Sequence, residues 1–562
     1  MPWRIPADPL GSVALAALAA ALPVILLCLA LVVLRWRASR AGLLGAGTAV
    51  AVAVAAFGMP VPLALLAALH GALYGLVPIA AIVLAAVFLQ DVAAATGSFA
   101  RLKEALSRAT SNRALQALLI AFGFGALLEG SAGFGAPVAI TAGILVGLGF
   151  PPLQAASLCL LANTVPVAFA AVGLPIAALA QATGLPAASL GIVTARLLAP
   201  LVVVVPLLLV ERVLPEGKRP RAVAAALAAG LAFSATQLLV AETLGPELPA
   251  LAGALAAVAV VVPFLGGARA GLGRDLLAGT APFLALALLV TGWSLPPVRA
   301  LLSRTTVTVA IPLLHGGVFD AARGATLPAT WGVPWLSGAG TAILLAALIS
   351  AAFGGLGPRE TARLLGGTIR RLLPAVGAVA AFLAFASIAS YSGMMSALGR
   401  VLAESGGAFP LLSPAIGWLG VVMTGSDTAS NAVFGRLQVA TAAETGTPAL
   451  LAAAANTVGG TAGKMLSPQS IAVACAASGL SGREGDLLKA ALPVSLVLGA
   501  LAGVVTFAAA AVAPWFLPGP VISYAGDRPS SGTWEGAALL ALSVVLAALV
   551  ASRGGRRRTA SA

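Results

Sequence analysis

Charged residues are scarce in this sequence: they make up 9% of its 562 residues, whereas 60% are hydrophobic. An ordinary soluble domain has about 25% charged residues, and no compact globule could hide this much apolar surface. The three cysteines, Cys28, Cys159 and Cys475, lie in apolar segments without metal-ligand spacing, so neither a disulfide framework nor a zinc site is indicated. A nucleophile elbow, a phosphate loop and a dinucleotide fingerprint are also missing. We therefore expect no metal, no cofactor and no enzymatic activity.

Long apolar runs are what the sequence has instead. Examples are residues 10–34, 41–90 and 130–195, each at least as long as the roughly 20 residues that a helix needs to cross a bilayer. No polar stretch is long enough to form a soluble domain, and the first run is too long for the core of a signal peptide. The sequence therefore predicts an all-α polytopic membrane protein with one transmembrane domain over residues 1–562 and a retained first helix.

The basic residues form short clusters between the apolar runs, and the net charge is +14. This pattern is typical of the positive-inside rule rather than of a nucleic-acid-binding face. Placing seven clusters in the cytoplasm accounts for 23 of the 32 Lys and Arg residues and leaves six in outside loops. The assignment predicts an outside N-terminus, a cytoplasmic C-terminus and about 13 transmembrane helices. The clusters lie at residues 35–40, 101–113, 212–221, 269–274, 359–371, 483–489 and 553–558.

Two stretches must return to the side from which they enter if this topology holds. Residues 114–150 are interrupted by a Gly/Ser-rich segment at 129–137, and residues 413–441 by one at 424–431. Glycine, serine and proline suit a backbone that leaves helical geometry. Such backbone is tolerated at membrane depth only where protein or a wet cavity satisfies it. We therefore predict two re-entrant helical hairpins, entered from opposite faces, whose tips mark a site.

The segment after each hairpin carries the same motif. Ala-Asn-Thr-Val occurs at residues 162–165 and again at 455–458. A proline follows each copy, Pro175 the first and Pro468 the second. The two motifs are 293 positions apart, and so are the two prolines. The two Gly-Ser pairs at the hairpin tips are 295 positions apart. The two halves have the same order of motifs, but they begin on opposite sides of the membrane. This predicts inverted repeats, with a binding site near the midplane. The repeats span residues 63–210 and 374–516.

Five charged side chains fall within apolar segments, where each costs roughly 2.5–3.5 kcal/mol at a helix centre. Glu129 and Asp427 lie at the hairpin tips and are predicted to carry protons, with helix capping as the alternative. Lys464 is predicted to pair with a substrate or counter-ion carboxylate, or else to extend towards the interface. Arg196 and Arg436 either clamp a carboxylate or pair with a structural acid or a lipid headgroup.

Neutral polar side chains complete the predicted site. The Asn-Thr pairs lie where we expect broken helices, and the glycine-rich run at 456–463 is also expected to leave helical geometry. Amides and hydroxyls there can bind a hydroxyl and a carboxylate, although hydrogen bonding between helices is the alternative. For His70 a packing role is favoured over a proton relay. The predicted substrate-binding residues are Gly130, Ser131, Asn163, Thr164, Ser426, Asn456, Thr457 and Lys464.

Four strings resemble the bacterial L-lactate permease family: LEGSAGFGAP at 128–137, LANTVPV at 161–167, GSDTASN at 425–431 and NTVGGTAGKMLSPQS at 456–470. The resemblance covers nearly the whole chain. It implies proton-coupled uptake of L-lactate, and in relatives glycolate, across the bacterial inner membrane, in a superfamily that uses paired hairpins. The expected partners are a small organic anion, a proton and membrane lipid, with no nucleic acid and an oligomer possible.

Three alternatives remain from the residues alone. A sodium-coupled carrier of other organic anions would use the same Asn-Thr motifs as sodium ligands. A membrane-embedded enzyme would need clustered acids or metal ligands near one interface, but the charges are scattered. A channel fits paired inverted hairpins less well than alternating access does.

Overall fold

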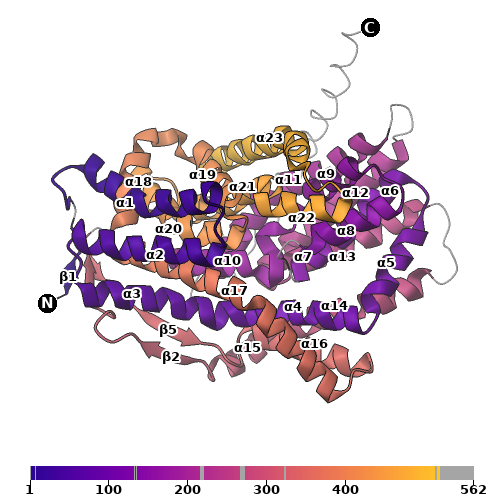
Figure 1. Cartoon of the computed structure of the whole chain (residues 1–562), viewed down its shortest axis with the longest axis horizontal. Coiled ribbons are helices and arrows are strands. Elements are labelled where there is room, and N and C mark those ends of the chain that lie inside the picture. The colour runs from indigo at the N-terminus through magenta and orange to yellow at the C-terminus, as the bar shows by residue number, and fades with distance from the viewer. Residues whose placement is uncertain are drawn as a thin grey trace, which may run out of the picture.

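Helices dominate the computed structural model, which describes residues 2–6, 8–131, 133, 136–214, 220–265, 272–321, 324–512 and 516–518 (Figure 1). The prediction of an all-α polytopic architecture is confirmed. The helices up to residue 213 are α1 (Val13–Cys28), α2 (Ala38–Ala55), α3 (Val61–Tyr74), α4 (Ala80–Ala95), α5 (Ser98–Ala109), α6 (Arg113–Ala117), α7 (Gly125–Ser131), α8 (Ala136–Gly147), α9 (Pro152–Asn163), α10 (Ala170–Thr183) and α11 (Ala187–Val213).

The later part of the chain is helical in the same way. Its helices are α12 (Pro220–Thr243), α13 (Pro249–Val261), α14 (Leu272–Ser294), α15 (Pro296–Ser303), α16 (Ala339–Phe353), α17 (Pro358–Tyr391), α18 (Met394–Leu402), α19 (Phe409–Thr424), α20 (Asp427–Thr445), α21 (Ala449–Gly463), α22 (Pro468–Ser478) and α23 (Glu484–Ala511). Short π-helical turns are η1 (Leu29–Val33), η2 (Gly75–Ile79) and η3 (Leu118–Phe124), and short 3₁₀ turns are η4 (Val167–Phe169), η5 (Val262–Leu265), η6 (Ala403–Ala408) and η7 (Lys464–Leu466).

In the described chain, ten helical segments are long and apolar enough to cross a membrane, or 11 if the bent pair α9 and α10 counts as one span. Three shorter apolar helices add to these, so the count of 13 crossings remains a prediction. Large apolar side chains such as Leu288 and Phe353 are 74% and 91% exposed, as expected for a surface that faces lipid. The basic cluster at 553–558, on which the orientation of the C-terminus depends, lies outside the described residues.

Two small sheets, which the sequence did not predict, are formed by four strands between α15 and α16 and one strand near the N-terminus. Strand β1 (Trp3–Arg4) pairs in parallel with β3 (Val318–Asp320), which pairs antiparallel with β4 (Ala325–Thr326). Strands β2 (Val307–Ala310) and β5 (Thr330–Val333) are antiparallel, with Val307 opposite Val333, and lie below α3 in Figure 1. The Trp331 indole donates to the Val77 carbonyl over 3.0 Å, which satisfies the backbone where η2 breaks between α3 and α4.

A helix-break-helix unit is present at both predicted hairpins. Helix α20 follows α19 after Gly425, which has φ +74°, and Ser426, whose hydroxyl caps α20 by accepting from the Ala429 amide at 3.3 Å. Helices α7 and α8 flank residues 132–135, of which three lie outside the described residues. In each unit the two arms pack against each other. That the hairpins are re-entrant remains a prediction.

The first arm of the first hairpin lies in the interior of the protein. The apolar window within Arg113–Ser131 is 100% buried, compared with 28% for Gly273–Ser294. The large hydrophobic core surrounds this segment and extends through α9, α11 and α12, while a second core joins α1, α2, α3 and α17. A helical segment that has no side facing lipid is suited to lining a binding site. It is less suited to anchoring the protein in the membrane.

Close packing of α19 on α21 explains the glycine-rich run. A Cβ atom added at Gly459 or Gly417 would overlap a backbone carbonyl of the opposite helix, and one at Gly463 would lie 2.5 Å from the Trp418 carbonyl oxygen. The expectation that residues 456–463 are not helical is therefore wrong, because α21 continues to Gly463. The glycines bring two helix backbones together.

The same order of elements occurs in both halves. In each, a helix-break-helix unit precedes a helix, a 3₁₀ turn, a second helix and a long proline-containing helix: α9, η4, α10 and α11, then α21, η7, α22 and α23. The predicted break after Asn163 is confirmed, since α9 ends there and the pair bends by 58°. The predicted break at Asn456 is wrong: that residue lies within α21, and the helix changes to a 3₁₀ turn only at Lys464.

Candidate binding site

Two acids and one lysine from different segments meet in the interior. Glu129 lies on α7, Asp427 begins α20 and Lys464 begins η7, with exposed fractions of 2%, 3% and 7%. Lys464 interacts electrostatically with both carboxylates. Its ammonium group donates a hydrogen bond to the Gly425 carbonyl at 2.6 Å, and it forms no ion pair within 4 Å in the described part of the chain. One cation is thus shared between two acids without contacting either.

Several polar atoms around this cluster have no hydrogen-bond partner among the described residues. They are both carboxylate oxygens of Asp427, one oxygen of Glu129 and both amide atoms of Asn163, all of them buried. Most buried polar atoms in proteins are hydrogen-bonded, and each that is not costs about 1–3 kcal/mol. A proton on a carboxylate and a polar ligand beside the amide would relieve this cost. The cluster is therefore the candidate site.

Helix packing brings these side chains to one place. Helix α9, which ends at Asn163, contacts both α7 and η7. Helix α10 in turn packs on α7 and α20. A Cβ atom added at Gly460 would overlap an oxygen of Asp427, so the carboxylate lies directly against the glycine surface of α21. The site is formed where the breaks of the two halves meet.

Asn456 is part of a hydrogen-bond network between helices. Its amide nitrogen donates to the Asn431 side-chain oxygen at 2.9 Å, and the Thr457 hydroxyl donates to the same atom at 3.0 Å. The Gln438 amide donates to the Asn456 oxygen at 3.1 Å. Asn431 donates to the Pro175 carbonyl at 3.0 Å and so joins α20 to α10. This is the alternative role, hydrogen bonding between helices, and Asn431 and Gln438 are contributors that the sequence interpretation missed.

The remaining predicted residues contact their own helices or a neighbouring one. The hydroxyls of Ser131 and Thr164 donate to the Leu128 and Leu161 carbonyls at 3.0 and 2.7 Å. A Cβ atom added at Gly130 would lie 3.0 Å from the Leu251 nitrogen, so this glycine permits close contact with α13. Binding of substrate by these three residues remains a prediction.

We expect the two asparagines to respond differently to replacement by alanine. Asn163→Ala removes a side chain without hydrogen-bond partners among the described residues. It should weaken substrate affinity about tenfold, which corresponds to about 1.4 kcal/mol, with little change in stability. Asn456→Ala breaks the network and should cost about 1–2 kcal/mol of stability. Transport KM and thermal unfolding in detergent measure the two effects. Equal losses of stability in both variants would contradict the distinction.

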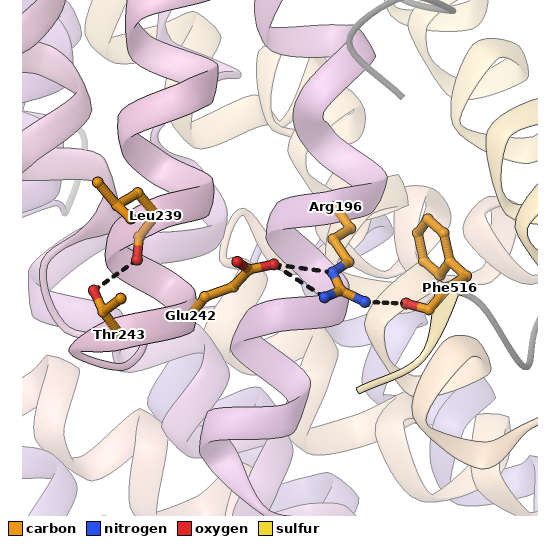
Figure 2. Close-up of polar contacts among 5 residues, drawn as sticks. All are labelled: Arg196, Leu239, Glu242, Thr243 and Phe516. Carbon is orange, nitrogen blue, oxygen red and sulfur yellow. Dashed lines mark hydrogen bonds and ion pairs between the residues drawn. The ribbon is translucent and has the colours of Figure 1, made fainter. Parts of the chain in front are cut away.

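Arg196 is held by a structural acid. Its guanidinium donates to Glu242 of α12 at 3.0 and 3.3 Å and to the Phe516 carbonyl at 2.5 Å, so that it lies between the two in Figure 2. The side chain is 7% exposed, compared with 31% for Glu242. The ion pair therefore joins α11 to α12 and to the segment that follows α23.

Arg196→Met should destabilise the protein. Removing one partner of a buried ion pair costs roughly 3–5 kcal/mol, and we expect the lower end because Glu242 is partly exposed. Thermal unfolding in detergent measures the loss, with Arg359→Met at an exposed position as the control. Transport per folded molecule should be unchanged. A stable Arg196→Met protein that no longer transports would instead assign the residue to the site.

His70 is a hydrogen-bonded packing residue, as the sequence interpretation favoured. One ring nitrogen lies 3.1 Å from the Thr330 carbonyl and the other 3.4 Å from the Ser387 hydroxyl. The rings of Tyr74 and Tyr391 pack edge-on against it. It is on α3, apart from the acids and the lysine.

Comparison with known proteins shows the family of this chain. The family model described as L-lactate permease matches residues 16–513. The chain belongs to the L-lactate permease family. Its members are permeases, so this chain is a transporter and not an enzyme. It is 41% identical to the glycolate permease GlcA of Escherichia coli strain K12 over 90% of this chain and 97% of that protein.

Two further relatives are L-lactate permeases. The proteins of Bacillus subtilis strain 168 and Escherichia coli strain K12 are each 38% identical to this chain, over 92% of it and 100% of their own length. Among solved structures, the Alcanivorax borkumensis YdaH transporter aligns with 80% of this chain and 88% of its own at 19% identity, with a TM-score of 0.43. The permease thus matches its curated relatives along their full length.

Proposed function

We propose that this permease carries small 2-hydroxy monocarboxylates, such as L-lactate and glycolate, into the cell together with protons. The relatives named for lactate and glycolate support the substrate class. The observation that carries the proposal is a set of buried polar atoms without hydrogen-bond partners among the described residues. They belong to Glu129 and Asp427, which interact with Lys464, and to Asn163 at the end of α9, which contacts η7. Each of these groups matches one part of a protonated or anionic hydroxy acid.

Substrate recognition follows from the donors and acceptors available. The Lys464 ammonium donates to a backbone carbonyl at the hairpin tip and can transfer that hydrogen bond to a substrate carboxylate. The Asn163 side chain offers an NH2 donor and a carbonyl acceptor, neither with a hydrogen-bond partner among the described residues, to a hydroxyl group that itself donates and accepts. A 2-hydroxy acid places the two groups on adjacent carbons. We therefore assign the carboxylate to Lys464 and the hydroxyl to Asn163.

Proton coupling follows from the membrane potential. Moving a monovalent anion into a negative interior is opposed by about 2.3 kcal/mol per 100 mV, whereas co-transport of one proton makes the step electroneutral. A buried carboxylate without hydrogen bonds is stabilised by binding a proton. Asp427, whose two oxygens have no hydrogen-bond partner among the described residues, is the proposed carrier, and Glu129 is the second candidate.

The proposed setting is the bacterial inner membrane, with the N-terminus outside and the C-terminus in the cytoplasm. We propose that residues 63–210 and 374–516 are inverted repeats with re-entrant hairpins at 114–150 and 413–441. The common order of elements in the two halves supports this arrangement. The placement of the acids and the lysine at the breaks of both halves fits a site at the repeat interface.

Uptake of radiolabelled L-lactate into proteoliposomes tests the proposal. With a proton gradient imposed, inward and alkaline inside, the permease should accumulate lactate, and dissipating the gradient should abolish accumulation. Glycolate should compete, whereas lactamide, its neutral amide counterpart, should not. Accumulation that requires a sodium gradient instead would support the sodium-coupled alternative. Failure to take up lactate or glycolate under any gradient would overturn the proposed substrate class.

A further inference from the structure

A polar cavity that is not lined by the two acids or the lysine lies elsewhere in the protein. It has a volume of about 220 Å³ and lies between α3, the end of α10, α17, α20 and the segment before β5. Small-molecule pockets typically measure roughly 300–1,000 Å³, so this cavity suits only a small ligand. The side chains that matter are His70, Tyr74, Gln181, Ser387, Tyr391 and Arg436.

Arg436 supplies the charge of this cavity. Among the described residues that line it, there is no carboxylate and no second Lys or Arg. One guanidinium nitrogen of Arg436 donates to the Thr183 carbonyl at 3.4 Å, which orients the group at the end of α10. A cavity lined by one sign of charge raises the local concentration of counter-ions. The planar guanidinium matches a carboxylate better than it matches a spherical anion.

The other polar groups surround the guanidinium with hydrogen-bonding capacity. The His70 ring and the Ser387 hydroxyl lie 3.4 Å apart, and the Tyr391 hydroxyl donates to the Pro328 carbonyl at 2.5 Å. Gln181 is partly exposed in the cavity wall and offers a donor and an acceptor. Amide and hydroxyl groups beside an arginine provide what a small hydroxy acid needs beyond its carboxylate.

The cavity lies on the same helix as the proposed proton carrier. Arg436 follows Asp427 by nine residues on α20, which places it about 13 Å farther along the helix. Asn431, between them, joins α20 to α10, and α10 contributes Gln181 to the cavity wall. The cavity also borders β5, so it lies on the side of the small sheets and the N-terminus.

We propose that this cavity is a second binding site, which captures a small carboxylate anion through Arg436 before the anion reaches Lys464. The inference rests on the proposed function for the identity of the anion. It adds to the proposed function a site at which the anion enters. Of the roles that the sequence left open for Arg436, it selects carboxylate binding.

Protection of an introduced cysteine tests binding directly. Gln181→Cys places a thiol in the cavity wall. The native Cys159 and Cys475 are buried, and Cys28 is partly exposed. The reaction of Cys28 in the parent protein therefore gives the background labelling. In proteoliposomes, lactate should slow the reaction of the introduced thiol with a membrane-impermeant reagent at least fivefold, and lactamide should not. Adding Arg436→Gln should remove the protection, whereas Arg304→Gln, at an exposed position near β2, should keep it. Equal protection by lactamide or chloride would overturn a carboxylate site.

Transport kinetics give the second readout. Arg436→Gln should raise the KM for lactate about tenfold with a maximal rate within twofold of the parent, and Arg436→Lys should fall between. If the Gln181→Cys protein takes up lactate but lactate does not protect its introduced thiol, the second binding site is overturned and the proposed function stands. If lactate protects that thiol but the parent protein takes up no lactate, the proposed function is overturned and the binding site stands. An unchanged KM in a folded Arg436→Gln protein would also overturn the entry site.

Discussion

Asp427→Asn is expected to abolish proton-driven accumulation of lactate and to preserve exchange of external for internal lactate. Asparagine keeps the size and polarity of the side chain but cannot carry a proton between the two faces. The buried carboxylate has no hydrogen-bond partner for either oxygen in the described chain, so no hydrogen bond from these residues stabilises its charged form. Uptake under an imposed proton gradient and counterflow at equal pH measure the two activities separately.

Glu444→Gln is the matched control for this experiment. Glu444 is an exposed acid near the far end of the same helix, α20, and its replacement should leave both activities unchanged. If the Asp427→Asn protein accumulates lactate as well as the parent does, the coupling role passes to Glu129 or to a sodium ion. Glu129→Gln under the two imposed gradients then distinguishes these possibilities.

Lys464→Met should reduce both accumulation and exchange by about 100-fold. Methionine preserves much of the length of the side chain but removes the cation that binds the substrate carboxylate and that interacts with both buried acids. A charge-assisted hydrogen bond contributes about 1.5–3 kcal/mol, and about 2.7 kcal/mol is a 100-fold change. Loss of exchange distinguishes this variant from Asp427→Asn, in which binding should persist.

Lys489→Met, at an exposed position on α23, is the control. Thermal unfolding in detergent should accompany both measurements, because Lys464 also holds the carbonyl of Gly425. A folded Lys464→Met protein with normal exchange would show that the substrate carboxylate binds elsewhere. Activity retained in Lys464→Arg but not in Lys464→Met would support the assignment.

The helical architecture could be predicted from the sequence because apolar runs of bilayer length have few other stable structures. The breaks at residues 425–426 and after Asn163 could also be anticipated, since glycine or proline coincides there with polar residues. The glycines at 459, 460 and 463 misled the same reasoning. A glycine either interrupts a helix or lets a second backbone approach it, and the outcome depends on which helix lies opposite.

The charged part of the candidate site was predictable for an energetic reason. Acids and lysines are costly at membrane depth, so Glu129, Asp427 and Lys464 stood out before their proximity was known. Neutral groups carry no comparable cost, which is why Asn431 and Gln438 were missed and why hydrogen bonding between helices could be offered for Asn456 only as an alternative to substrate binding. Pairing of Arg196 with Glu242 requires knowing that α11 lies against α12, which no periodicity in the sequence reveals.

The contact between α19 and α21 limits how this permease can move. Two helices whose backbones touch at three glycines have no side-chain layer that could repack between them, and sliding either by a fraction of a turn would drive carbonyls into α-carbons. We therefore expect the pair to move as a rigid body, with Lys464 directly after the end of α21. We expect the 3₁₀ turns η4 and η7 to be the joints, so opening and closing should be sought as changes in the bend at these turns.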